Sequence, residues 1–285
     1  MQPRVEHFFH EPTNSLSYLL WEEGGTRAAV VDPVLDYEAA AGRTATRAAE
    51  GIARRLEALG LQLAYILETH VHADHLSAAP FLKERLGGLT AIGAGVVMVQ
   101  RLFREVFAAD DLAADGSQWD LLLSPGASLP LDRLAIEAMA TPGHTPACMT
   151  YLAGDAAFVG DTLFAPDYGS ARCDFPGGDA AALYRSIQAL LALPEETRLF
   201  LCHDYRPGGR DLRWQTTVGE QRGENVHLKA GTSEAAFVGF RRERDATLSM
   251  PALMIPAVQV NIRGGRLPPP EENGTRYLKI PLDRL

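Results

Sequence analysis

Three histidines and one aspartate stand within six consecutive positions, in a pattern typical of metal-binding sites. They are His70, His72, Asp74 and His75, and they follow the apolar run 63–67. That run is short and bounded by polar residues, so it predicts a buried strand whose C-terminal end carries the histidines. Imidazole and carboxylate groups are ligands of divalent iron and zinc. The sequence therefore predicts a metal centre at this strand end.

The spacing inside this loop indicates that its ligand-type side chains point in two different directions. His70 and His72 are two positions apart on a nearly extended segment, whereas Asp74 and His75 lie where the next helix is expected to begin. In an extended chain alternate residues point to the same side, and a helix start turns the chain away from that direction. The two pairs are therefore expected to face neighbouring points, which leaves open whether the site holds one metal ion or two.

Three further ligand-type residues each follow an apolar, strand-like run. They are His144 after 134–139, Asp161 after 156–159, and His203 after 199–202. Alone, each would fit a structural histidine or a turn residue. Together they are the first polar groups at several strand ends, and rigid strand ends are where ligands are best fixed. We expect them to join the histidine loop in one site. Asp32, near the end of the strand-like run 27–34, either caps a turn or supports a metal-bound histidine.

Strand-like and helical patterns alternate along the chain. The sequence predicts strands that include 15–21 and 27–34 and helices at 44–59, 77–86, 96–107, 179–191 and 233–246. Alternation of strands and helices, with polar residues at the strand tips, predicts an α/β architecture with a site at one rim. We expect the chain, residues 1–285, to form a single domain, with 206–285 as a C-terminal extension packed on it.

Composition excludes several classes of partner. The chain has 285 residues, 46% of them hydrophobic and 22% charged, and a net charge of −9. This acidity disfavours nucleic acid, whose phosphates require a basic face. No apolar stretch approaches the roughly 18 residues needed to cross a bilayer. The N-terminus lacks a secretory pattern and three scattered cysteines do not suggest disulfides, so we expect a cytoplasmic location and no membrane association.

The order of ligand types along the chain resembles the metal-ligand series of the metallo-β-lactamase fold superfamily, here carried by His70, His72, Asp74, His75, His144, Asp161 and His203. That resemblance implies a metallo-β-lactamase-like four-layer αβ/βα sandwich, with the site at the edge of two facing sheets. It says less about the reaction, because one fold hosts many activities.

Shorter segments resemble one group within this superfamily. Residues 169–175 and 203–205 are similar to segments of the persulfide dioxygenases, the ethylmalonic encephalopathy protein-like group. The resemblance implies one Fe(II) per chain, held by His70, His144 and Asp161, with open positions for dioxygen and a substrate sulfur. Such an enzyme oxidises glutathione persulfide with O2 to sulfite and glutathione. The other ligand-type residues would then hydrogen-bond the ligands or bound water, namely His72, Asp74, His75 and His203.

The same residues are also sufficient for two metal ions. A complete set of this kind resembles glyoxalase II, which implies a dinuclear site of two zinc or iron ions that hydrolyses a glutathione thioester. Residues 241–245 also resemble the C-terminal part of glyoxalase-II-like proteins and their relatives. A bridging hydroxide between ions roughly 3.5–4 Å apart would be the nucleophile. A non-catalytic sulfur-sensing or partner-binding protein is a third hypothesis. The family resemblance also makes a homo-oligomer possible.

Substrate-binding residues are expected next to the ligands, because glutathione carries carboxylates that arginine binds well. Arg172 and Tyr205 lie in segments that adjoin ligands, and Arg206 and Lys229 are weaker candidates. We expect Cys173 to pack or to line the pocket, because neither mechanism needs a thiol nucleophile.

Overall fold

Two six-stranded sheets face each other in the computed structural model, which describes residues 2–228 and 231–284. The first sheet, in spatial order, consists of β1 (Arg4–His10), β2 (Ser15–Trp21), β3 (Arg27–Val31), β6 (Gln62–Leu67), β8 (Leu89–Gly93) and β9 (Leu121–Leu123). The second consists of β10 (Ser128–Leu131), β11 (Leu134–Ala140), β12 (Met149–Ala153), β13 (Ala156–Phe158), β14 (Arg198–Phe200) and β15 (Gln215–Thr217). A small third sheet contains β5 (Arg43–Ala45), β4 (Val34–Glu38) and β7 (Leu76–Ser77).

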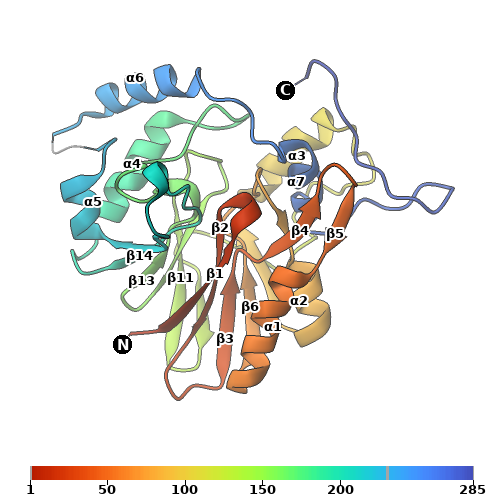
Figure 1. Ribbon diagram of the computed structural model, residues 1–285, viewed down its shortest axis with the longest axis horizontal. Helices are drawn as coiled ribbons and strands as arrows, with labels where there is room; N and C mark the ends of the chain where they lie inside the picture. The colour runs from red at the N-terminus through yellow and green to blue at the C-terminus, as the bar shows by residue number, and fades with distance from the viewer. Residues whose placement is uncertain (1, 229–230, 285) are drawn as a thin grey trace.

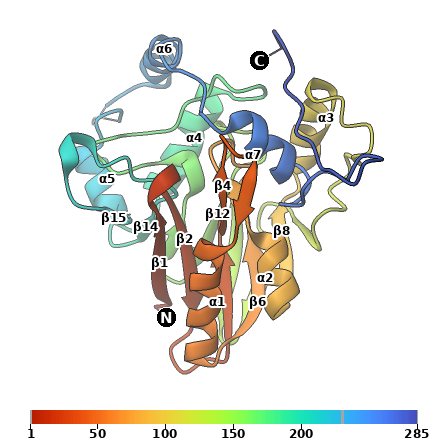
Figure 2. The ribbon, with the colours of Figure 1, turned by 45° about the vertical axis from the view of Figure 1, so that its right-hand side comes forward.

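Helices cover both outer faces of this pair of sheets. On the side of the first sheet lie α1 (Arg47–Leu59), α2 (Ala79–Leu86) and α3 (Val96–Val106), and on the side of the second lie α4 (Ala180–Leu191), α5 (Val218–Glu224) and α6 (Glu234–Asp245) (Figure 1). The last helix, α7 (Met254–Asn261), packs against β7 and lies near β4 (Figure 2). This arrangement confirms the predicted α/β class and the four-layer αβ/βα sandwich. No helix among the described residues is long and apolar enough to span a membrane.

The alternation of side chains along β2 shows why both faces of a sheet become buried. Leu16, Tyr18 and Leu20 point into the core between the two sheets, whereas Leu19 points outward and packs in the same cluster as Ile52 of α1. Successive strand residues face opposite sides, so an almost continuous apolar run fits only a strand covered on both faces. Burying each such side chain contributes about 1.5–3 kcal/mol.

Several predicted boundaries differ from the structure for local reasons. The helix expected from residue 77 begins at Ala79, because Ser77 belongs to β7 and pairs with β4. The strand expected over 27–34 ends at Val31, because Asp32 has a φ of +50°, which no strand accommodates. The helix expected from residue 44 begins at Arg47, because residues 43–45 pair with β4 instead. Its end is as expected, since Gly60 takes the left-handed conformation with a φ of +65°.

Chain segments after residue 206 contribute to the sandwich and also cover it. β15 pairs with β14 in the second sheet, α5 and α6 contact α4, and α7 contacts β7. The division into one domain with a C-terminal extension from residue 206 stays a prediction. What matters for the site is that the last residues of β6, β11, β13 and β14 are followed directly by the loops that carry the ligand-type side chains.

Candidate metal centre

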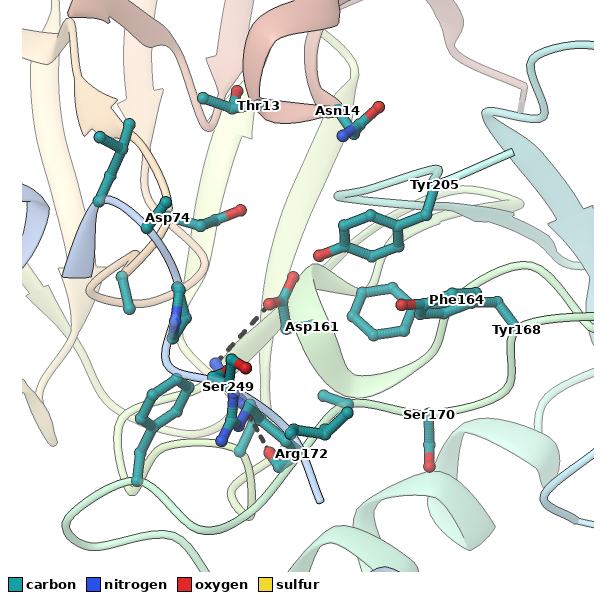
Figure 3. A pocket seen from close by; sticks show the side chains of 18 of the residues that line it. Thr13, Asn14, Asp74, Asp161, Phe164, Tyr168, Ser170, Arg172, Tyr205 and Ser249 are labelled. Carbon is teal, nitrogen blue, oxygen red and sulfur yellow. Dashed lines mark hydrogen bonds and ion pairs between the residues drawn. The ribbon is translucent and has the colours of Figure 1, made fainter. Parts of the chain in front are cut away.

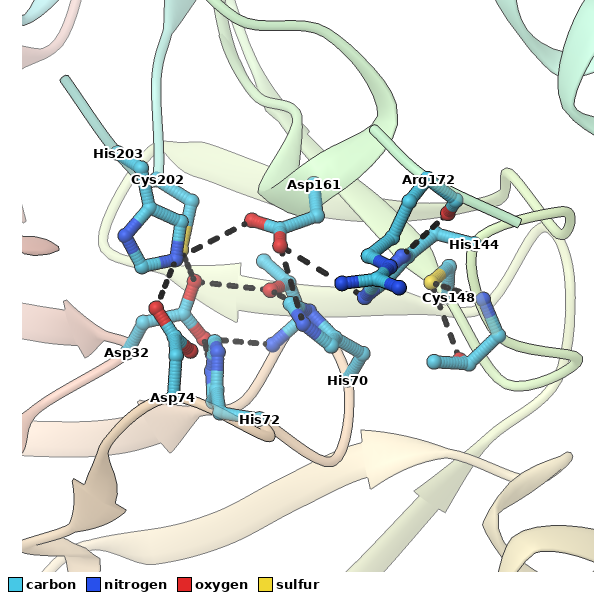
Figure 4. Close-up of polar contacts among 12 residues, drawn as sticks. Asp32, His70, His72, Asp74, His144, Cys148, Asp161, Arg172, Cys202 and His203 are labelled. Atoms are coloured by element: carbon cyan, nitrogen blue, oxygen red, sulfur yellow. Dashed lines mark hydrogen bonds and ion pairs between the residues drawn. The ribbon is translucent and has the colours of Figure 1, made fainter. Parts of the chain in front are cut away.

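Asp161 lies at the centre of the ligand-type residues (Figure 4). Its Oδ2 is 3.8 Å from Nε2 of His70 and 3.7 Å from Nε2 of His144, and its Oδ1 is 3.4 Å from Nε2 of His203. The four residues come from loops that follow four different strands. All four are buried. The structure thus brings these four side chains together, as the sequence predicts.

Hydrogen bonds determine which ring nitrogen His70 presents to Asp161. The Thr69 hydroxyl donates to Asp32 Oδ2 at 2.9 Å, so its oxygen is free to accept from Nδ1 of His70, which lies 3.0 Å away. With the proton on Nδ1, the lone pair is on Nε2, a buried atom that has no hydrogen-bond partner. Burial, reinforced by the neighbouring histidines, lowers the pKa of His70 well below its usual value, which keeps the ring neutral.

A backbone carbonyl has the same effect on His144. Its Nδ1 lies 2.8 Å from the carbonyl oxygen of Arg172, and because a carbonyl only accepts, Nδ1 carries the proton. In the neutral ring the lone pair is then on Nε2, which lies 3.7 Å from Asp161 Oδ2. Metal-bound histidines are typically oriented in this way, by a hydrogen bond from the nitrogen that does not bind the metal.

These three residues fit a single divalent ion. One donor atom from each of His70, His144 and Asp161 can be chosen so that all three lie within 4.8 Å of one another. Two ligands bound at about 2.1 Å can be at most about 4.2 Å apart, and both nitrogen–oxygen distances at Asp161 are shorter than that. Two neutral imidazoles and one carboxylate, a partnerless buried nitrogen among them, are a suitable donor set for iron or zinc.

A second cluster of donors lies beside the first, formed by His72, Asp74, His75 and His203, whose donor atoms also lie within 4.8 Å of one another. Nε2 of His203 is 3.1 Å from Oδ2 of Asp74. Burial disfavours the charged form of His75, another member of this cluster, and lowers its pKa to about 4. The geometry of this cluster is compatible either with a support for the first metal ion or with a second ion.

His72 has two acidic partners on the side of its Nε2. That atom lies 3.0 Å from Oδ1 of Asp32 and 3.3 Å from Oε2 of Glu68. Burial opposes protonation of His72, but the two carboxylates outweigh it and raise the pKa well above its usual value. Of the two roles open to Asp32, its carboxylate therefore supports a histidine of the site, and it also accepts from the Thr69 amide at 2.7 Å.

A pocket of about 440 Å³ opens directly onto Asp161 (Figure 3). Asp74 and His144 also line it, and Tyr205 forms part of its wall. The Tyr205 ring stacks on Tyr168 with 4.7 Å between ring centroids. A phenol ordinarily loses its proton only near pH 10, so the hydroxyl of Tyr205 is a neutral hydrogen-bond donor at physiological pH. The site therefore has a chamber of the size of a small ligand next to its carboxylate.

The predicted substrate arginines differ in their surroundings. Arg172 lines the pocket, but its guanidinium binds Asp174 through two hydrogen bonds of 2.6 Å and donates to the Ser249 carbonyl at 2.7 Å. Arg206 lies over the Phe9 ring and 3.3 Å from Glu11, away from the pocket lining. Lys229 lies outside the described residues. Cys173 is buried, and its amide donates to Asp245.

Helix α6 supplies two pocket residues that we did not single out from the sequence. Arg241 is 1% exposed, donates to the Ser170 carbonyl at 3.2 Å and pairs with Asp245. Arg244 also lines the pocket and has no anionic partner among the residues that the structure describes. The Arg-Arg-Glu-Arg-Asp run placed both on one helix, but only the tertiary structure shows that they turn toward the pocket.

The half-buried His227 contacts the pocket segment that contains Ser170, and it does so with a neutral ring. Its Nδ1 accepts from the Ser170 amide at 2.9 Å, a bond that protonation of Nδ1 would break. Burial, followed by the charges of Arg241 and Arg244, lowers the pKa of His227 to about 3. The unfolded chain takes up this proton near pH 6.5, whereas the folded chain does so only near pH 3. Acid therefore favours unfolding across that window.

We expect His227→Asn to make folding less sensitive to acid between pH 6.5 and 4. The Asn side chain oxygen can accept from Ser170 as Nδ1 does, but it takes up no proton. As the pH falls, the free energy of unfolding of wild-type protein should decrease by at most about 1.4 kcal/mol more per pH unit than that of the variant. The difference should be smaller than this because the ring is partly solvated. Urea unfolding at a series of pH values measures the difference, and parallel curves would show that His227 does not titrate in this way.

Comparison with known proteins is consistent with this geometry. A model of the Metallo-beta-lactamase superfamily matches residues 10–203. The chain is 56% identical to a Probable metallo-hydrolase of Burkholderia pseudomallei, over 99% of both proteins, and 43% identical to Glyoxylase B2 of Dictyostelium discoideum, over 99% of this chain and 98% of that protein. It is 32% identical to the mitochondrial Persulfide dioxygenase ETHE1 of Mus musculus, over 93% of this chain and 90% of that protein.

Two further matches define how far this similarity extends. The chain spans only 65% of the length of a Beta-lactamase hydrolase-like protein of Xylella fastidiosa, to which it is 52% identical. The crystal structure of ETHE1 from Myxococcus xanthus superposes with a TM-score of 0.73 at 28% sequence identity, covering 93% of this chain and all of that one. Relatives with both hydrolase and dioxygenase names thus share this fold.

Proposed function

This chain belongs to the metallo-beta-lactamase superfamily, and from that premise we propose that it is an Fe(II)-dependent persulfide dioxygenase. It would oxidise glutathione persulfide: one persulfide, one dioxygen and one water give one glutathione, one sulfite and two protons. The observation that carries the proposal is the pair of imidazoles, His70 and His144, whose Nε2 atoms both lie within 3.8 Å of one carboxylate oxygen of Asp161.

The donor set supports iron chemistry. We propose His70, His144 and Asp161 as the ligands of one Fe(II). Two histidines and one carboxylate leave other coordination positions open, an arrangement typical of non-haem iron oxygenases. Bound iron supplies the redox chemistry that activates dioxygen, which zinc lacks. Asp161 neutralises one of the two positive charges, and the remaining net charge of about +1 favours the anionic sulfur of a persulfide.

The pocket supports a substrate that carries carboxylates. Arg244, which has no anionic partner among the described residues, is the guanidinium best placed to bind a substrate carboxylate. Tyr205 offers a neutral hydroxyl to a polar group of the same ligand. Arg172 has its guanidinium committed to Asp174 and Ser249, so we propose that it shapes the wall and that its carbonyl orients His144.

Oxygen consumption tests this proposal. The iron-loaded protein should take up dioxygen when glutathione persulfide is added, and should form sulfite in a ratio of about one to one with the oxygen consumed. Glutathione and S-lactoylglutathione are the controls, and neither should cause oxygen uptake. Rapid hydrolysis of the thioester without oxygen consumption would contradict the proposal.

We expect Arg244→Gln to raise KM for glutathione persulfide by about tenfold, which corresponds to about 1.4 kcal/mol of lost substrate binding. The iron content should not change, because Arg244 does not contact the ligands. Arg172→Ala should also raise KM more than it lowers iron content, since the backbone carbonyl that orients His144 stays in place. Steady-state kinetics with metal analysis measures both effects. Arg242→Gln, on the exposed side of α6, is the control, and an unchanged KM in Arg244→Gln would remove this residue from substrate binding.

A dinuclear thioester hydrolase is the second candidate. It is favoured by the 3.4 Å between Asp161 and His203, which would let Asp161 bridge two ions, by the second donor cluster, and by the 43% identity to Glyoxylase B2. The number of bound metal ions and the need for dioxygen distinguish the two functions. A non-catalytic sulfur-sensing protein would show neither reaction. The cytoplasmic location and the homo-oligomer stay predictions.

A further inference from the structure

We propose that Asn261, at the end of α7, is a positioning residue that holds the metal-binding loop of residues 70–77 in place. This inference rests on the metal site of the proposed function, and it holds for iron or zinc and for either reaction. Asn261 lies 184 residues beyond Ser77 in the chain, in a helix that the Pro-rich sequence around it did not predict.

The Asn261 side chain uses all of its hydrogen-bonding groups on this loop. Nδ2 donates to the backbone carbonyls of His72 at 2.8 Å and His75 at 2.7 Å. Oδ1 accepts from the backbone amide of Ser77 at 2.8 Å. The side chain is 4% exposed, so water does not substitute for these contacts. One amide therefore fixes both the middle and the end of the loop.

Packing holds α7 close to the loop. Leu76 forms one small apolar cluster with Ala257 and Val260 of α7. After the helix the chain turns through Gly265, where a Cβ atom would lie 2.9 Å from the Ser77 carbonyl oxygen. The backbone at residue 265 thus comes so close to Ser77 that glycine is required there. Asn261 therefore has little freedom to move away from its partners.

The three hydrogen bonds that Asn261 makes to the loop require an amide side chain. A carboxylate of the same shape would still accept from Ser77 but could donate to neither carbonyl, and its charge would repel both oxygens. His72 and His75 would then lose the contacts that fix their backbone positions. The proposed ligand on this loop is His70, which stands two residues before His72, so a backbone shift at His72 would also move His70. Partners that hold metal ligands in position through hydrogen bonds typically contribute 10–100-fold in metal affinity. We expect an effect of that size here.

Gln259 provides a matched control on the same helix. It is 5% exposed, and its amide makes the same pattern of bonds to other parts of the chain: Nε2 donates to the carbonyls of Ile255 and Lys279, and Oε1 accepts from the Lys279 amide. Asn261→Asp and Gln259→Glu therefore remove equivalent bonds from equally buried positions. Only the first removes bonds to the metal loop.

The test is the Co(II) affinity of full-length protein, measured by competition with a chelator and by the visible absorption of the bound ion. Asn261→Asp should bind Co(II) about 10–100-fold more weakly than wild type and with an altered spectrum, whereas Gln259→Glu should bind as wild type does. Circular dichroism establishes that both variants are folded, and Asn261→Ala, which adds no charge, replaces Asn261→Asp if that variant does not fold.

Equal affinity of wild type and the folded Asn261 variants would overturn the proposal, as would an equal loss in Gln259→Glu. Both outcomes leave the proposed function intact, because wild type still binds metal. Failure of wild-type protein to bind Co(II) would instead overturn the metal site, and with it both the proposed function and this inference.

Discussion

We expect the Asp161→Ala variant to lose both its bound iron and its persulfide oxidation. Asp161 is the only carboxylate in the proposed ligand set, and its Oδ2 is the atom that both His70 and His144 face. Without it two neutral imidazoles remain, which neither neutralise the ion nor complete the three-ligand face. Iron affinity should fall by at least about 100-fold, since even residues that only orient ligands contribute 10–100-fold.

Iron content after anaerobic loading and desalting, together with oxygen uptake, measures this loss. Asp115→Ala is the control, because Asp115 lies in an exposed loop and the variant should retain both properties. Thermal unfolding of the metal-free proteins separates loss of metal from loss of fold. An Asp161→Ala variant that keeps about one iron per chain would show that the ligand set is wrong.

We expect His203→Ala to retain its iron and to lose at least about tenfold in turnover. We infer that with a single ion His203 supports the ligand carboxylate and does not bind the metal: its Nε2 lies 3.4 Å from Asp161 Oδ1 and 3.1 Å from Asp74 Oδ2, so a proton on this nitrogen would orient Asp161. Partners of this kind change activity by about 10–100-fold. Metal analysis and kcat on the same preparation measure both quantities.

His7→Ala is the matched control for this variant, because His7 stacks on Trp214 away from the ligands and should leave iron and turnover unchanged. A dinuclear site makes the opposite prediction for His203→Ala: the variant would lose one of two ions. Loss of half of a two-metal complement would therefore rule out the single-ion account.

The residues of the site could be predicted from the sequence because each follows an apolar strand. His70, His144, Asp161 and His203 are polar groups that come after β6, β11, β13 and β14, and the strands themselves are evident from their apolar runs. The four-layer sandwich followed from the same ligand order by resemblance to a known family. Local signals also placed the start of α4, where Asp179 accepts from two amides of the first turn.

What the sequence could not provide are contacts between distant segments. The proton position on His70 depends on Thr69 and Asp32 together, and the role of Asn261 depends on a helix that contains Pro256 and was not predicted. Pro256 lies in the first turn of α7, where its missing amide hydrogen costs no helical bond. Arg172 lies in the segment that follows the ligand Asp161, but its pairing with Asp174 depends on the folded loop.

The most direct test of the central claim is X-ray absorption at the iron edge of the anaerobically loaded protein, with the iron content of the same sample. The account predicts one iron per chain, with two imidazoles among its ligands and no second metal ion nearby. Two metal ions per chain, with a metal–metal distance of roughly 3.5–4 Å, would contradict it.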